Sequence, residues 1–167
     1  MSKGVQCTQI RFRAIPLKKL FKKENIMLMI TITESTIAQM ITLGNYDCTN
    51  ENIAKKFQFN SAAIGTWEFK FISAGKAISS EEAKKLCEVD GLQSGSVEHL
   101  LALGAALPNL QKQNPIIALG SVCGIGGDRS VPALWFGDGR RELGLNWWSN
   151  GWFDGYRFLS VRKVSDH

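Results

Sequence analysis

The 167-residue chain is poor in the residues from which common catalytic and metal sites are built. Its only two histidines are His99, in a segment that predicts a helix, and His167, the last residue. The four cysteines, none of them in a Cys-x-x-Cys pair, are Cys7, Cys48, Cys87 and Cys123. Zinc ligands come in close pairs, so the spacing predicts no metal site. There is no GxGxxG motif before a helix and no GxxxxGK motif, so we expect no cofactor and no catalytic residues.

Long apolar runs are also missing. No stretch approaches the roughly 20 apolar residues that a membrane span requires. The run "IMLMITI" is too short for a signal peptide and lacks a small-residue cleavage site after it. Since nothing else suggests export, the cysteines are interpreted as reduced thiols and the protein as cytoplasmic.

Basic charge is confined to one end of the chain. Residues 1–26 contain seven Lys and Arg and one Glu, a net charge of +6, whereas residues 27–167 carry a net charge of −1. This asymmetry predicts a basic extension over 1–26 and a single domain over 27–167. The extension is either an upstream segment before a natural start at Met27 or Met29, or a flexible arm for anionic surfaces. Any nucleic-acid contact would have to lie in residues 1–26.

Hydrophobic periodicity in the first two thirds of the chain predicts mainly helices. A short strand and a helix capped by Ser35 or Thr36 are expected over 30–43, and another short helix near 51–57. Alternation over 65–73 predicts a half-buried strand. Ser79 and Glu82 form a capping box for a helix ending at Gly91, with Ala83, Leu86 and Cys87 on its apolar face.

The pattern then changes from helical to β. A second helix is expected to begin at Ser96, with Val97, Leu100, Leu101 and Gly104 facing inward. The apolar run 116–122 predicts a buried strand and "GSVCGIGGDRSVP" a glycine-rich loop. Asp138-Gly139 predicts a hairpin turn, and "YRFLSVRK" a last strand. Helices followed by antiparallel β hairpins indicate an α+β fold.

The segment "SSEEAKKLCEVDGLQSGSVEHLLALG" and the ending "YRFLSVRK" resemble C-type lectin-like domains. The resemblance covers about residues 78–163. It points to the branch of the formylglycine-generating enzyme and related bacterial lectin-like modules. It implies two helices packed on antiparallel hairpins that display loops. "QSGS" stands where the lectins have Leu-Pro-Thr, and neither a Glu-Pro-Asn nor a Gln-Pro-Asp calcium motif is present.

The stretch "NWWSNGWFDGYRF", residues 146–158, is the candidate binding surface. In a strand over 141–148, Leu143, Leu145 and Trp147 share one face, interpreted as core together with Phe158, and Trp148 lies on the more polar face. Aromatic rings between amides and hydroxyls are typical of binding surfaces. The predicted ligand-binding residues are Arg129, Arg140, Arg141, Asn146, Trp148, Ser149, Asn150, Trp152, Asp154 and Tyr156.

These features favour a non-enzymatic module that binds a ligand, expected to be a protein. One version makes it a variable protein of a diversity-generating retroelement, whose codons 129–156 would be rewritten at adenines. A second hypothesis is an oxidoreductase of the formylglycine-generating type. The C-terminal region has only Cys123, whereas those oxidases use two nearby cysteines. A third is a nucleic-acid-binding regulator that works through residues 1–26.

Overall fold

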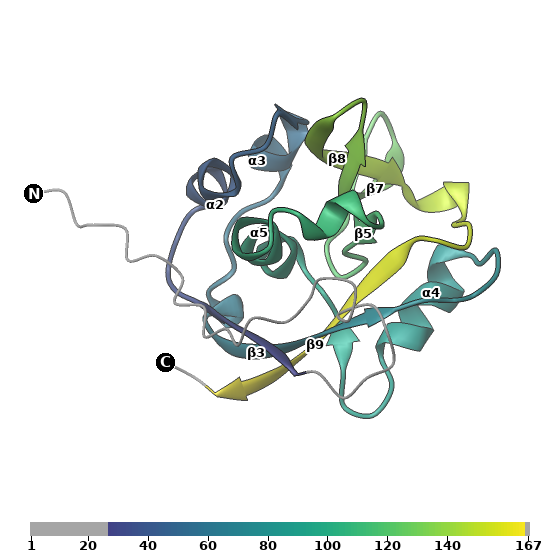
Figure 1. Ribbon diagram of the computed structural model, residues 1–167, viewed down its shortest axis with the longest axis horizontal. Helices are drawn as coiled ribbons and strands as arrows, with labels where there is room; N and C mark the ends of the chain where they lie inside the picture. Colours follow the sequence, from purple (N-terminus) through teal and green to yellow (C-terminus); the bar gives the residue numbers. More distant parts are fainter. Residues whose placement is uncertain (1–26, 166–167) are drawn as a thin grey trace, which may run out of the picture.

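The computed structural model describes residues 27–165, which form four α-helices and one mixed nine-strand sheet (Figure 1). This confirms the α+β class. The predictions for the basic segment 1–26 lie outside the described residues. The helices are α2 (Ile37–Gly44), α3 (Asn52–Lys56), α4 (Ser80–Cys87) and α5 (Val97–Ala106). The strands are β1 (Leu28–Ile32), β2 (Cys48–Thr49), β3 (Gly65–Ile72), β4 (Gln93–Ser94), β5 (Ile116–Ile117), β6 (Cys123–Ile125), β7 (Asp128–Gly137), β8 (Arg140–Trp147) and β9 (Arg157–Ser165).

The C-terminal strand β9 lies in the middle of the sheet, whose strand order is β1-β3-β9-β5-β7-β8-β2. It pairs antiparallel with β3 and β4 but parallel with β5, and β2 pairs parallel with β8. The predicted antiparallel hairpins are therefore present, but the sheet that they join is mixed rather than antiparallel throughout. Only the tight turns of β6–β7 and β7–β8 impose antiparallel pairing, whereas long connections leave strand direction open.

The predicted helix starts are confirmed. Thr36 caps α2 in a capping box with Gln39, and Ser79 caps α4 in one with Glu82. Helix α4 ends at Cys87, four residues before the predicted stop, and the chain turns at Gly91 with a positive φ of 77°. The predicted apolar face of α4 is confirmed for Ala83 and Cys87, which are buried. The prediction was wrong for Leu86, which is 39% exposed.

A second correction concerns the glycine-rich segment 120–132. It was expected to be a loop, but residues 123–125 form β6, which pairs antiparallel with the start of β7. Gly126 and Gly127 make the turn between them, with φ values of 59° and 90°. Glycine adopts these left-handed conformations without strain, so these two glycines can form a tight hairpin turn. The predicted buried strand over 116–122 is shorter, since only Ile116 and Ile117 form β5.

The sheet separates two hydrophobic clusters. Helices α2, α3 and α5 pack on one face, with Trp67, Phe69 and Leu143 among the buried contacts. Helix α4 and the loop 148–156 pack on the other face, against Val131 and Phe158 (Figure 1). Within 27–165 no helix is long and apolar enough to cross a membrane.

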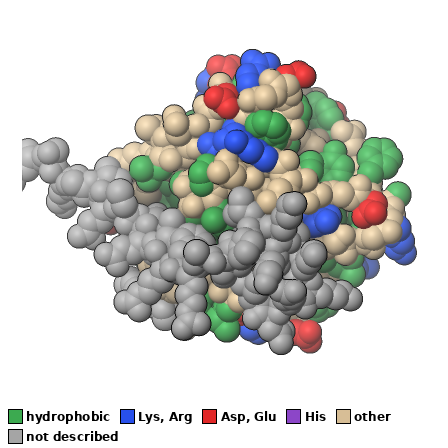
Figure 2. Space-filling view, in the orientation of Figure 1, with side chains coloured by type: hydrophobic (Ala, Val, Ile, Leu, Met, Phe, Trp, Pro, Cys, Tyr) green, Lys and Arg blue, Asp and Glu red, His purple; other side chains and the backbone are tan. Residues whose placement is uncertain are grey.

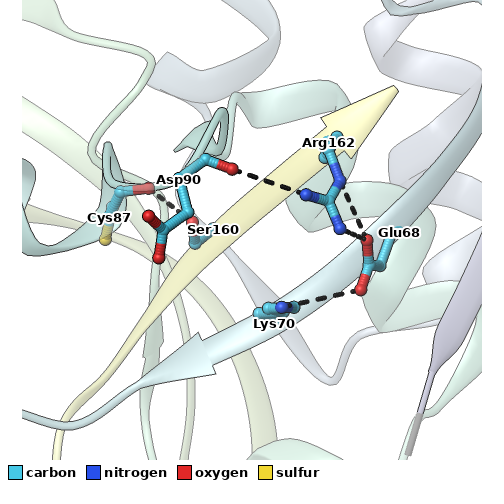
Figure 3. Close-up of polar contacts among 6 residues, drawn as sticks. All are labelled: Glu68, Lys70, Cys87, Asp90, Ser160 and Arg162. Carbon is cyan, nitrogen blue, oxygen red and sulfur yellow. Dashed lines mark hydrogen bonds and ion pairs between the residues drawn. The ribbon is translucent and has the colours of Figure 1, made fainter. Parts of the chain in front are cut away.

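Glu68, on the α4 side of β3, is buried although the alternation predicted an exposed position. Its carboxylate accepts hydrogen bonds from Arg162 of β9, at 3.1 Å from Nε and 2.5 Å from the terminal nitrogen, and faces Lys70 Nζ at 3.7 Å (Figure 3). Ser160 of β9 donates to the carbonyl of Cys87 at the end of α4, at 2.6 Å. These hydrogen bonds and ion pairs connect the last strand, β9, to β3 and to the end of α4.

Arg141 of β8 was predicted to bind ligand at the rim of the site, but its side chain points into the α2–α5 face and is only 9% exposed. Its guanidinium donates to the carbonyls of Gly44 at 2.6 Å and Asn45 at 3.2 Å, both at the end of α2. It also donates to the carbonyl of Gly104 in α5 at 3.0 Å. Carbonyl groups at helix C-termini carry partial negative charge, so the cation satisfies two helix ends at once.

Replacing Arg141 by Ala should lower the free energy of unfolding by about 3 kcal/mol or more, because the carbonyl groups of α2 and α5 lose a buried donor. Urea denaturation measures the change. The matched control is Arg140→Ala, one residue earlier and exposed, for which a change within about 0.5 kcal/mol is expected. Equal effects of the two variants would contradict the anchoring role of Arg141.

His99 is a packing residue in α5 rather than a base. Its Nδ1 accepts from the backbone N–H of Ser96 at 3.0 Å, and its ring packs edge-on against Trp67 with centroids 4.2 Å apart. Burial lowers its pKa from 6.5 to about 3. The folded protein therefore keeps the imidazole neutral at pH values where the unfolded chain protonates it.

His99 therefore makes the free energy of unfolding depend on pH. The contribution of its neutral ring is fully present above about pH 6.5 and is lost as the pH falls toward 3. His99→Gln keeps a residue that can complete the cap at Ser96 but cannot titrate. Between pH 7.5 and 4.5 the wild type should lose about 2.5 kcal/mol more unfolding free energy than this variant. Urea denaturation at both pH values measures these changes. An equal loss of unfolding free energy in the wild type and in His99→Gln would show that the folded protein does not keep the ring of His99 neutral.

Candidate functional site

The β7–β8 hairpin contains most of the exposed aromatic and arginine side chains near the predicted site. Its two-residue turn is Asp138-Gly139, with φ values of 50° and 73°, as the sequence predicted. Figure 2 shows hydrophobic side chains at the surface on the side where Figure 1 places β7, β8 and the loop before β9. Residues directly opposite each other share a face of the hairpin, so the register decides which side chains meet.

Both predicted binding tryptophans are part of the core. Trp148 is 7% exposed and donates from Nε1 to Glu81 Oε1 at 2.6 Å. Trp152 is 2% exposed, donates from Nε1 to Ser80 Oγ at 2.8 Å, and packs edge-on against Phe158. The expectation that these rings form an exposed surface was wrong, because both polar N–H groups find acceptors at the start of α4.

The remaining predicted residues of the loop 148–156 lie nearer the solvent. Ser149, Asn150 and Asp154 are exposed. Tyr156 is partly buried against the α4 cluster, with its ring 5.2 Å from that of Trp152. Phe153, which was not predicted, is 72% exposed. The loop thus presents polar groups and the exposed ring of Phe153 around two buried tryptophans.

Trp147 shows where strand alternation fails. Its strand neighbours Leu143 and Leu145 face the α2–α5 cluster as predicted. Trp147 is on the same face, yet it is 40% exposed and not part of the core. Phe158, the other ring interpreted as core, is confirmed at 1% exposure.

Arg129 lies at the start of β7 against Trp148. The centre of its guanidinium is 4.8 Å from the indole centroid, and its terminal nitrogen is 3.8 Å from Glu81 Oε1. The hydrogen bond from Trp148, followed by smaller contributions that include the charge of Arg129, lowers the pKa of Glu81. An indole, a carboxylate and a cation thus form one cluster at this end of the hairpin.

A row of outward side chains follows β8 on the same face as Trp148. We call Arg140, Glu142 and Asn146, together with Trp135 directly opposite Glu142, the outer row. In residues 27–165, the side chains of Arg140, Glu142 and Asn146 make no hydrogen bond or ion pair. Two of them, Arg140 and Asn146, were predicted as site residues.

Trp135 forms the apolar part of the outer row and was missed by the sequence reasoning. Its indole covers two glycines: a Cβ built on Gly137 would lie 2.6 Å from its six-membered ring, and one on Gly144 3.4 Å from its Nε1. The ring therefore lies along the hairpin, and its other side is open, with 40% of the residue exposed. The sequence signal was Trp135 followed by Gly137 on the same strand and by Gly144 beyond the turn.

The titratable groups give little support for catalysis. Burial raises the pKa of the Cys87 thiol to about 12 and also raises that of Cys123, so neither forms a thiolate readily. No group of three or more His, Cys, Asp or Glu side chains within the described part of the chain could hold a metal ion.

Comparison with known proteins finds no match, whether with family models, curated proteins or solved structures. The outer row and the tryptophan cluster must therefore be interpreted from their own geometry.

The double variant Trp148→Ala, Trp152→Ala should lose at least about 4 kcal/mol of unfolding free energy, because each truncation leaves a cavity beside α4. Such a loss approaches the whole stability of a typical domain. Phe153→Ala, in the same loop but exposed, serves as the control and should change stability by no more than about 0.5 kcal/mol. Thermal or urea unfolding measures both, and wild-type stability in the double variant would place the rings outside the core.

Proposed function

We propose that this protein is a non-enzymatic binding module that holds another protein against the outer row of the β7–β8 hairpin. The observation that supports this proposal has two parts. The indole of Trp135 is exposed on one side, and the polar side chains beside it have no partner within residues 27–165. By contrast, Arg141 and Glu68, which hold parts of the fold together, make hydrogen bonds within it.

The chemistry of the outer row fits a protein surface. Tryptophan and arginine are enriched where proteins bind one another, because they bring large contact area and directional hydrogen bonds. Alternate residues of a strand stand about 7 Å apart in a straight line, so Arg140, Glu142 and Asn146 match an extended stretch of a partner. Exposed Ser149 and Asn150 continue the polar surface beyond the strand.

The C-type lectin-like resemblance belongs to this proposal. Two helices in succession, α4 and α5, are followed by the β7–β8 hairpin and the closing strand β9, which is the order that the resemblance implies. On such a scaffold the hairpins display the binding surface. Retroelement diversification of codons 129–156 stays a prediction of the sequence.

The net charge of −1 over residues 27–167 favours a protein over a nucleic acid as the ligand of this surface. Phosphate backbones are bound by several Lys and Arg side chains together, and the outer row combines one arginine with one carboxylate. A mixed-charge row instead matches a partner with charges of both signs.

A photo-crosslinking amino acid placed at Asn146 should capture a discrete partner in the cells that make this protein. The same group at Leu43, which is 42% exposed on α2, is the matched control and should capture none. Adding Trp135→Ala should abolish the adduct at position 146 while circular dichroism shows an intact fold. The proposal would be contradicted if no adduct formed at position 146, or if both positions gave identical adducts. An adduct that nuclease digests and protease does not would contradict it as well.

A further inference from the structure

The hairpin already contains one filled cation site. Arg129 stacks on Trp148 at 4.8 Å, and Glu81 accepts from the indole N–H while lying 3.8 Å from the guanidinium. A cation over an aromatic face gains electrostatic energy from the ring, and a neighbouring carboxylate adds an ion pair. Here the protein supplies all three components itself.

The outer row repeats two of these components without the third. Trp135 and Glu142 are opposite each other on β7 and β8, on the face of the hairpin that carries Trp148. Residues paired in this way have Cβ atoms about 5 Å apart, so one group can contact both the indole and the carboxylate. No cation of residues 27–165 lies over Trp135 or pairs with Glu142.

We infer that Trp135 and Glu142 receive an arginine side chain of the partner protein. This inference rests on the proposed function and specifies the chemistry of the group that the outer row binds. A guanidinium is planar, so it can stack on the open side of the indole and donate two parallel hydrogen bonds to a carboxylate. Lysine offers a compact charge without that plane and should bind more weakly.

Arg140 sets the charge pattern expected around that arginine. It lies two residues before Glu142 on the same face, opposite Gly137. Its positive charge favours a carboxylate of the partner beside it. The surface recognised by the outer row therefore presents an arginine beside an acidic residue.

The probe is the peptide acetyl-Gly-Arg-Gly-amide, whose only charge is the guanidinium. Titrated into the full chain at low salt, it should produce a saturable shift of the Trp135 indole N–H signal in NMR spectra, with a millimolar Kd. Glu142→Gln should weaken this binding at least tenfold. The peptide with citrulline in place of arginine keeps the shape but not the charge, and it should produce no saturable shift.

Arg129→Ala provides a positive control within the molecule. It empties the cation position over Trp148, so the arginine peptide should then also shift the Trp148 indole signal. Equal shifts with citrulline, or arginine binding that Glu142→Gln leaves unchanged, would overturn the inference. If the Asn146 adduct forms but does not depend on Glu142, the outer row binds a protein without an arginine contact, which refutes this inference and leaves the proposed function intact.

Discussion

The burial of Arg141 is the interaction on which the candidate site depends. Its guanidinium holds the ends of α2 and α5 together through hydrogen bonds to backbone carbonyl groups of both helices, at 2.6 to 3.2 Å. Because side chains alternate along a strand, fixing residue 141 on the helix side turns Arg140 and Glu142 to the opposite side. A slip of one residue would bury two unpaired charges and expose Leu143, so the register is strongly determined.

The other end of the hairpin is fixed by the two buried tryptophans. Trp148 and Trp152 donate to Glu81 and Ser80 in the first turn of α4, which lies on the opposite face of the sheet from Arg141. The outer row thus lies between two anchors that belong to different cores. In the proposed function, holding this surface at both ends positions its side chains before a partner binds, which lowers the entropy cost of binding.

Local signals in the sequence predicted much of this fold. The capping box at Ser79, the cap expected at Ser35 or Thr36 and the Asp138-Gly139 turn need only neighbouring residues, and all three are present. The fate of Arg141 depends on helix ends 37 and 97 residues away, so the residue was taken for a surface charge. Trp148 likewise packs in the α4 cluster, and its N–H donates to an acceptor 67 residues away. The alternation of side chains along a strand predicts that neighbouring residues face opposite sides of the sheet. It does not predict which of those sides a distant part of the chain will cover.

Arg129 and Arg140 illustrate how an intramolecular partner decides whether a site is available. A tethered guanidinium is present at a high effective concentration, so Arg129 occupies Trp148 and Glu81 against free competitors. No arginine of the hairpin stands in the corresponding position for Trp135, since the residue opposite it is Glu142 and Arg140 faces Gly137. The same two chemical groups therefore hold an arginine of the chain itself at one end of the hairpin and, in the inference above, an arginine of the partner at the other.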